Sequence, residues 1–302
     1  MTISERPVQF TCEGEQLFGI CTPAPGASRL GVVIVVGGPQ YRVGSHRQFV
    51  HLARSLAGNG IPAFRFDYRG MGDAEGAIRP FDCIDADIRV AIDAFRLHCP
   101  AVEEIVLWGL CDGASAALMY AAQDERVTGL VLLNPWVRDG QTEAVTQIKH
   151  YYARRIFNPD LWRKVIRGRF QLRRFLADAR RTVSAAMAGG SPAGPVQGAT
   201  FQERMLSAWQ RFQGRALIIL SGRDLTAKEF LEYSAARPPW QRLLDGSRTT
   251  RQDFPDADHT FSTRQDRDAV AACTARWIHE TFVSTDSELA GSPLSTAAGR
   301  AA

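Results

Sequence analysis

Residues 105–115 read IVLWGLCDGAS, an apolar run that enters a Gly-x-Cys-x-Gly turn. We expect a buried strand up to Trp108 and a helix of small side chains after the turn. Gly109 and Gly113 lie two residues to either side of Cys111, where larger side chains would collide with the neighbouring strand and helix. The central residue of such a turn is held in a strained conformation, so Cys111 is a candidate nucleophile. The alternative is an inert, packed thiol.

The composition favours one globular domain. The chain has 302 residues, 45% hydrophobic and 23% charged, which is enough for one large core. A net charge of +4 is too small to argue for nucleic acid, and we expect none as a partner. The six cysteines show no CxxC or zinc-finger spacing, so no metal or cofactor is expected. Residues 1–10 lack the pattern of a signal peptide, which favours a cytoplasmic protein with reduced thiols.

Strands alternate with helices along the chain, which is typical of an α/β fold with a mostly parallel, twisted sheet and helices on both faces. The expected strands are 8–12, 16–22, 30–36, 61–66, 104–108, 129–133, 216–220 and 249–254. The expected helices are 45–59, 82–98, 113–122 and 264–282. In such sheets the chemistry lies just past the carboxyl ends of the strands.

The alternation breaks after Trp136, where a helical, arginine-rich stretch intervenes. We expect residues 1–136 and 213–283 to form the α/β core and residues 137–212 to form an inserted helical lid. Residues 284–302 are rich in Ser, Thr, Ala and Gly, a composition that predicts a disordered tail.

A nucleophile needs a base, and the base needs an orienting group. Asp224 follows the end of an expected strand, and His259 lies in the loop before the last helix, so the chain order Cys111, Asp224, His259 fits a catalytic triad. Asp256 and Asp258 are alternatives to Asp224, although both are too close to His259 in sequence to reach its far ring nitrogen easily. The remaining histidines are interpreted as solvated or packing residues: His46, His51, His98, His150 and His279.

An acyl intermediate also needs two backbone N–H donors for its oxyanion. We expect one from Asp112 and the other from the loop at residues 37–42, GGPQYR. Its proline cannot donate, so Gln40 is the first candidate and Gly38 the second. The alternative is that this loop is only a turn. Three further side chains are expected to contact the substrate: Tyr41, Arg42 and Trp136.

These features together resemble the α/β-hydrolase superfamily, and the cysteine nucleophile is similar to that of dienelactone hydrolases. Residues 66–76, FDYRGMGDAEG, look like the Asp-x-Arg-Gly-x-Gly-x-Ser loop of many such hydrolases. With residues 36–47 and 108–113, they resemble more narrowly the exosortase A system-associated hydrolase 1 proteins, which bacteria encode with exopolysaccharide and protein-sorting genes. The resemblance covers residues 7–282 and implies the α/β-hydrolase fold.

The thiolate form of a cysteine is the attacking species, and a helix N-terminus lowers the pKa of the thiol. A carboxylate of Asp112 close to Cys111 would oppose that effect. Thiolate is also a better leaving group than alkoxide, so a cysteine enzyme favours activated acyl groups. We therefore expect a hydrolase that cleaves an activated acyl ester or thioester through an acyl-enzyme. The alternatives are an acyltransferase that uses the same acyl-enzyme and a non-catalytic binding protein of the exopolysaccharide machinery.

Residues 158–181 combine apolar residues at near-helical spacing with eight basic residues. One interpretation is a lid helix with a solvated outer face. The other is an anionic partner: a phosphopantetheine-bearing carrier protein, a coenzyme A ester or an acidic membrane surface. The oligomeric state has no signature in the sequence.

Overall fold

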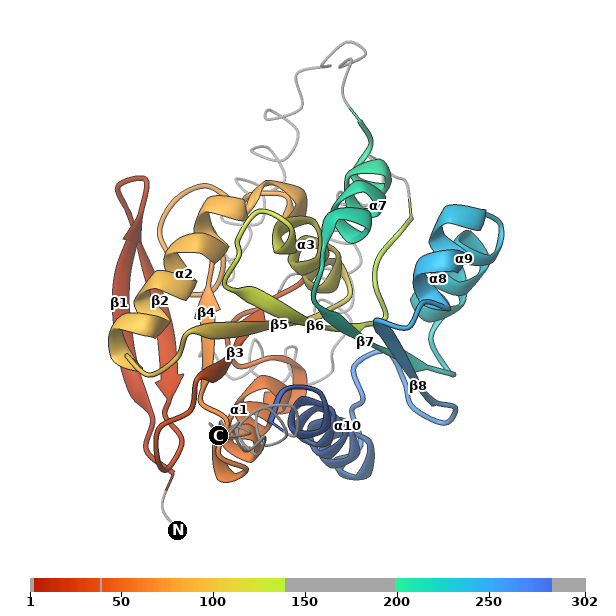
Figure 1. Ribbon diagram of the computed structural model, residues 1–302. Helices are drawn as coiled ribbons and strands as arrows, with labels where there is room; N and C mark the ends of the chain where they lie inside the picture. The colour runs from red at the N-terminus through yellow and green to blue at the C-terminus, as the bar shows by residue number, and fades with distance from the viewer. Residues whose placement is uncertain (1–2, 39, 139–198, 284–302) are drawn as a thin grey trace, which may run out of the picture. The chain divides into compact units, whose positions relative to one another are not determined.

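The computed structural model describes residues 3–38, 40–138 and 199–283, and a mixed sheet lies at its centre (Figure 1). The strand order is β1-β2-β4-β3-β5-β6-β7-β8. The first hairpin is antiparallel and joins β4 in antiparallel register, whereas all pairs from β4 to β8 are parallel. The strands are β1 Arg6–Cys12, β2 Glu15–Thr22, β3 Leu30–Val35, β4 Ala63–Asp67, β5 Glu104–Leu110, β6 Val127–Leu133, β7 Arg215–Ser221 and β8 Thr249–Phe254.

The central strands are buried along almost their whole length. Every residue of β3 and β4 is buried, as are all but the first residues of β5 and β7. Parallel strands covered on both faces need such continuous apolar sequences. The eight strands predicted from sequence are therefore confirmed, although β5 and β6 extend two residues beyond their predicted bounds.

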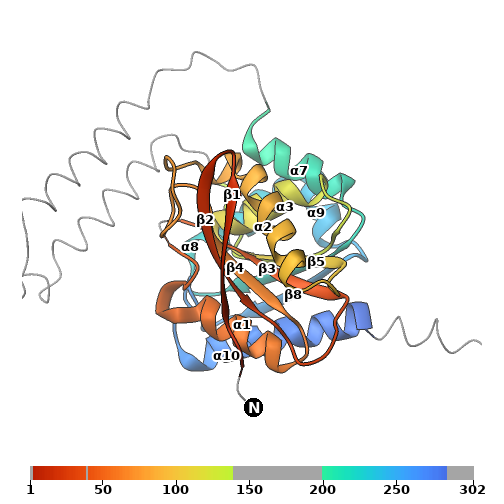
Figure 2. The same cartoon turned by 90° about the vertical axis from the view of Figure 1, so that its left-hand side faces the viewer.

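Helices cover both faces of the sheet. In Figures 1 and 2, α1 and α10 lie together on one face, and α2, α3 and α7 lie on the other. Short 3-10 turns, Ser45–Arg47 and Phe81–Cys83, precede α1 and α2, and a π turn, His279–Val283, follows α10. The helices are α1 Gln48–Gly58, α2 Asp85–His98, α3 Asp112–Ala121, α7 Phe201–Arg211, α8 Leu225–Ala235, α9 Pro238–Leu244 and α10 Arg264–Ile278.

The small side chains of α3 let this helix pack closely on the sheet. Every residue from Gly113 to Ala121 is buried, and α3 contacts β5, β6 and α7. Such close packing fixes the first turn of α3 beneath the end of β5. The α/β fold class predicted from sequence is thus confirmed.

Most of the predicted lid and the whole predicted tail lie outside the described residues. α7, at the end of the predicted lid range 137–212, packs against α3 and belongs to the same compact unit as the sheet. The lid itself stays a prediction. In the described part of the chain, no helix is both long enough and apolar enough to cross a membrane.

Candidate active site

Cys111 lies on a sharp turn between β5 and α3. Its backbone angles are φ 60° and ψ −126°, a region that residues with a side chain rarely adopt. A Cβ on Gly109 would come within 2.4 Å of the Gly113 oxygen, and one on Gly113 within 2.6 Å of the Val35 oxygen. The two glycines of the Gly-x-Cys-x-Gly turn are therefore needed because backbone passes where their side chains would lie.

The backbone of Cys111 is tied to the neighbouring strand. Its N–H donates to the Leu133 oxygen at 2.9 Å, and its carbonyl accepts from the Trp136 N–H at 3.3 Å. The Ser115 hydroxyl in turn donates to the Trp136 oxygen at 2.7 Å. These bonds hold the strained turn in place, with the Cys111 side chain partly buried.

Asp224 and His259 are hydrogen-bonded to each other. Nδ1 of His259 lies 2.8 Å from Oδ2 of Asp224, directly past the end of β7. The Asp224 carboxylate also accepts from the Thr226 and Ala227 N–H groups at 3.1 Å each, so it caps α8. Burial raises the pKa of this carboxyl, but the bonds from His259 and the two amides outweigh burial and bring the pKa below its ordinary value.

The carboxylate fixes which nitrogen of His259 carries the proton. With Nδ1–H donated to Asp224, Nε2 is left as the acceptor, the form that a general base requires. The ring is about one-third exposed, at 35%. His259 follows β8 and Cys111 follows β5, and because β5 to β8 are parallel, both lie at the edge of the sheet where the strands have their carboxyl ends. When His259 is protonated, its charge lowers the pKa of the Asp112 carboxyl, next to Cys111 in sequence.

The other candidate acids and bases have different partners. Asp256 pairs with Arg223 on the surface at 2.8 Å. Asp258 accepts from the Thr260 N–H and shapes the loop. Among the other histidines, His98 bonds a carbonyl of its own helix, His279 bonds the Asn59 oxygen, His46 is exposed, His51 lies on α1 and His150 lies outside the described residues.

Asn134 joins the three loops of the site, and the sequence patterns did not single it out. It is fully buried, has φ 43° and follows β6 directly. Its Oδ1 accepts from the Ser221 N–H at 2.9 Å, and its amide donates to the Ser221 hydroxyl at 2.8 Å and to the His259 oxygen at 3.1 Å. An asparagine directly after a buried strand was the only signal available, because asparagine tolerates positive φ.

The predicted oxyanion loop meets the turn through the Asp112 side chain. Oδ1 of Asp112 accepts from the Gly113 N–H at 3.0 Å, and the backbone amides of Gly38 and of Asp112 itself lower the pKa of this carboxyl. Gly38, the second candidate, lies beside this carboxyl, since a Cβ on Gly38 would be 4.0 Å from its Oδ1. The side-chain oxygen of Gln40, the first candidate, accepts from the Ser45 N–H at 3.3 Å. Both assignments remain proposals.

The three predicted substrate contacts lie in different surroundings. Arg42 is engaged in two ion pairs, with the buried Asp67 and, at 2.6 Å, with Asp73, so it joins two loops of the chain. Tyr41 is 45% exposed. Trp136 is partly buried beside Cys111 through the backbone bonds described above. Their contact with substrate remains a proposal, and for Arg42 a structural role is already evident.

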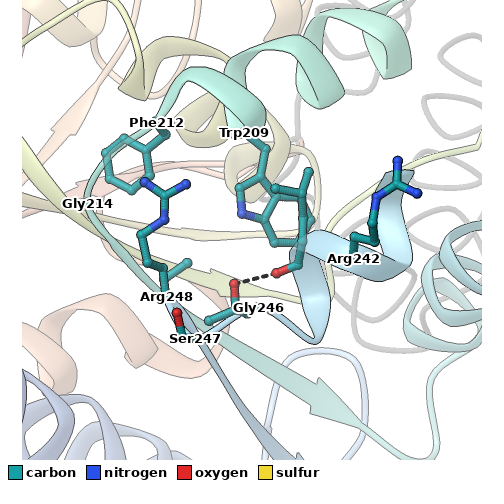
Figure 3. Close-up of a pocket in the computed structure, with 10 residues that line it drawn as sticks. Trp209, Phe212, Gly214, Arg242, Gly246, Ser247 and Arg248 are labelled. Carbon is teal, nitrogen blue, oxygen red and sulfur yellow. Dashed lines mark hydrogen bonds between the residues drawn. The ribbon is translucent and has the colours of Figure 1, made fainter. Parts of the chain in front are cut away.

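A pocket of about 230 Å³ lies elsewhere, at the amino ends of β7 and β8. Figure 3 shows the Arg248 side chain extending toward Phe212 and the Arg242 side chain pointing away from Phe212. Trp209 lies between the two arginines. Because Asp224 follows the carboxyl end of β7, the pocket lies at the opposite edge of the sheet from the candidate site. Within the described residues, no group of three or more His, Cys, Asp or Glu side chains is arranged to hold a metal ion.

Comparison with known proteins gives the family. Residues 32–273 match the model of the alpha/beta hydrolase family. The chain belongs to this family. Solved structures similar to this chain include alpha/beta hydrolases. An esterase of Pyrococcus furiosus has a TM-score of 0.64 at 15% identity, over 92% of each chain.

A second relative appears both by sequence and by structure. The chain is 30% identical over 144 residues to a polyketide transferase of a Penicillium species. That match covers 45% of this chain and spans only about half, 47%, of the relative's length. The solved alpha/beta hydrolase GrgF of Penicillium sp. sh18 has a TM-score of 0.61 at 17% identity, over 93% of this chain and 99% of that one. At these identities the structural likeness shows the fold alone.

Proposed function

We propose that this alpha/beta hydrolase cleaves activated acyl esters or thioesters through an acyl-enzyme on Cys111. The observation that supports this most directly is the 2.8 Å hydrogen bond between His259 and Asp224, on the side of the sheet where Cys111 occupies the strained turn. An inert structural cysteine needs neither the strained backbone nor an oriented histidine. The same pair of features argues against a protein that only binds its ligand.

The proposed reaction proceeds in two steps. Nε2 of His259 takes the Cys111 proton, and the thiolate attacks the acyl carbon to form a tetrahedral oxyanion. The carbon–leaving-group bond breaks, and the leaving group receives the proton from His259. Water then gives a proton to His259 and attacks the thioester, and the acid departs while the proton returns to Cys111. Asp224 keeps the ring in the required tautomer throughout.

The nucleophile restricts the substrate. An intermediate on Cys111 can expel either the thiolate or the other group, and an ethoxide is the poorer leaving group of the two. With a thioester or an aryl ester, the departing group competes on equal terms. We therefore expect faster turnover of the N-acetylcysteamine thioester of an acid than of its ethyl ester; faster turnover of the ethyl ester would contradict the proposed substrate class.

The acyl-enzyme can be observed by intact mass after mixing with p-nitrophenyl acetate. Six cysteines are free, and Cys83 is exposed, so labelling of thiols alone would not identify the nucleophile. We expect the acetyl adduct in the wild type and in Cys83→Ala and its loss in Cys111→Ala. An adduct that persists in Cys111→Ala would disprove the assignment of the nucleophile.

Transfer of the acyl group to an acceptor other than water is the second candidate. The observation that favours it is the partial match to a polyketide transferase. The acyl-enzyme and triad are the same, but an alcohol or amine replaces water in the second step. Adding candidate acceptors during turnover should divert the product from free acid to ester or amide if the chain is a transferase. Free acid alone would favour the hydrolase.

We further propose that the acyl group arrives on a coenzyme A ester or a carrier protein, in a bacterial exopolysaccharide or exosortase system. This rests on the sequence resemblance of residues 36–47, 66–76 and 108–113 and on the basic stretch 158–181, which lies outside the described residues. Contact of that stretch with an acidic membrane surface is the alternative. Replacing Arg163, Lys164 and Arg167 with glutamine should raise KM for a coenzyme A ester, because arginine forks suit phosphate. An unchanged KM would remove this support.

A further inference from the structure

The carboxyl of Asp112 lies against the backbone donors that the proposed reaction needs. Its Oδ1 accepts from the Gly113 N–H at 3.0 Å, and the backbone amides of Gly38 and of Asp112 itself also favour its charged form and lower its pKa. The fit is tight, since a Cβ on Gly37 would lie 2.3 Å from its Oδ1. The side chain is therefore folded back over the start of α3 and against the loop that follows β3.

Two of these three backbone amides have an assigned task in this family. The oxyanion hole of an alpha/beta hydrolase consists of the N–H after the nucleophile and an N–H from the loop after β3. We take the Asp112 N–H and, of the two candidates in that loop, the Gly38 N–H as these donors. An N–H that donates to a carboxylate cannot donate to a substrate oxyanion with the same strength and direction.

We propose that the Asp112 carboxyl occupies the oxyanion hole of the resting enzyme and selects substrates, because the substrate carbonyl must displace it before Cys111 can attack. The inference rests on the proposed acyl-enzyme function. A small ester offers only its carbonyl for this exchange, whereas a larger acyl group brings binding energy from contacts elsewhere. Asp112 thus suppresses wasteful hydrolysis of small esters and leaves larger acyl groups as the productive substrates.

The charge of the carboxyl sets how strongly it occupies the hole. Its titratable neighbours are Cys111 beside it in sequence, Tyr68 just past the end of β4, and His259. Burial raises the pKa of Asp112, and the three N–H groups and His259 lower it less than burial raises it. Above this pKa the carboxylate accepts charge-assisted hydrogen bonds; below it the neutral acid accepts weaker ones. The block therefore strengthens as pH rises through the pKa of Asp112.

The test compares two variants that differ in the oxygen they retain. Asp112→Ala removes the carboxyl, and Asp112→Asn keeps an oxygen acceptor of the same size without the charge. We measure the acylation rate as the burst of p-nitrophenolate from p-nitrophenyl acetate. We expect Asp112→Ala to acylate at least about tenfold faster than the wild type, in line with the size of oxyanion-hole effects. Asp112→Asn should gain less, and the ratio of Asp112→Ala to wild type should rise with pH.

A second measurement avoids turnover. A trifluoromethyl ketone forms a tetrahedral adduct with a thiolate and needs the oxyanion hole, so it should bind Asp112→Ala about tenfold more tightly than the wild type. Asp112→Ser, in which a hydroxyl group replaces the carboxyl, serves as a second variant if Asp112→Ala folds poorly. We expect the same gain in affinity for the ketone. Circular dichroism of each variant establishes that it is folded.

The outcomes separate the two hypotheses. Slower or unchanged acylation in folded Asp112→Ala, with the acetyl adduct still on Cys111, would overturn the role of Asp112 and leave the acyl-enzyme intact. Absence of any adduct on Cys111 in both the wild type and Asp112→Ala would overturn the proposed function itself. A tenfold gain that is equal in Asp112→Asn and Asp112→Ala would show that charge repulsion on the thiolate, not occupation of the hole, is the cause.

Discussion

Single residues of the candidate site have a structural role and a chemical role at the same time. Asp224 caps α8 through two amides and, with the same carboxylate, holds Nδ1 of His259. The helix cap fixes the position of the carboxylate, so the orientation of the histidine follows from the start of a helix. A change at this position can therefore be chosen to alter the chemistry while leaving part of the cap in place.

Asp224→Asn is such a change. The asparagine oxygen can still accept from one of the two α8 amides, so we expect the free energy of unfolding to fall by only about 1 kcal/mol. Its amide cannot hold the Nδ1–H tautomer, and the acylation rate at pH 7 should fall by about 10²–10⁴-fold. Asp256→Asn, in a surface pair with Arg223, is the matched control and should retain its rate. An equal loss in the control would point to Asp256 as the acid.

Whether a site residue could be predicted from the sequence depends on what fixes the position of its side chain. Asp224 and His259 could be proposed because each follows the end of a strand, and the sheet brings strand ends together. The orientation of the Asp112 side chain could not be predicted. It depends on one side-chain rotamer and on Gly38, which lies 74 residues earlier in the chain. No local pattern records such a contact.

At the scale of elements, the site is held by the polar ends of three neighbouring segments. Asn134 follows β6 directly and bonds the last residue of β7 and the loop that carries His259. These bonds satisfy backbone groups that no strand partner reaches at the edge of the sheet. They also fix the distance between the loop of His259 and the strand that lies beside the cysteine turn.

Asn134→Ala should affect both stability and chemistry. It leaves the Ser221 N–H buried without a partner, which costs about 1–3 kcal/mol of unfolding free energy. It also releases the His259 oxygen, so the acylation rate should fall even in folded protein. Thr128→Ala, on the same strand but with only a long 3.4 Å bond to Glu104, is the control. Urea denaturation and burst kinetics measure the two effects; equal stability of both variants would contradict the role of Asn134.

Strands and helices could be predicted from the sequence where the pattern of residues that defines them is local. The central strands were found because their continuous apolar runs are long enough to recognise, and α3 because its small residues follow such a run. α8 and α9 were missed because their packing is not local: Trp240 is 1% exposed and meets Trp209, Phe230 and Tyr233 edge to face. Those partners come from two other helices, α7 and α8.

In the molecule as a whole, buried charge joins segments that are distant in sequence. Arg69, in the loop after β4, donates to Asp87 of α2 through its backbone N–H at 2.9 Å and through Nε and Nη2 at 2.9 and 2.8 Å. It also pairs with Glu13 at the turn of the first hairpin. Both Arg69 and Asp87 are almost fully buried, at 2% and 0% exposure. The Asp-x-Arg-Gly segment, noticed first as a family resemblance, thus has a structural task.

Removing only one member of the Arg69–Asp87 pair should lower the free energy of unfolding far more than removing both. Arg69→Met leaves the Asp87 carboxylate buried without its counter-charge, and we expect a loss of about 3–5 kcal/mol of unfolding free energy. The double variant Arg69→Met/Asp87→Leu should recover most of it, because two apolar side chains of similar size replace the pair. Arg29→Met breaks the exposed pair with Glu103 and should cost less than about 1 kcal/mol. Urea denaturation followed by circular dichroism measures all three; a double variant as unstable as Arg69→Met alone would mean that the arginine stabilises the protein through packing and not through charge.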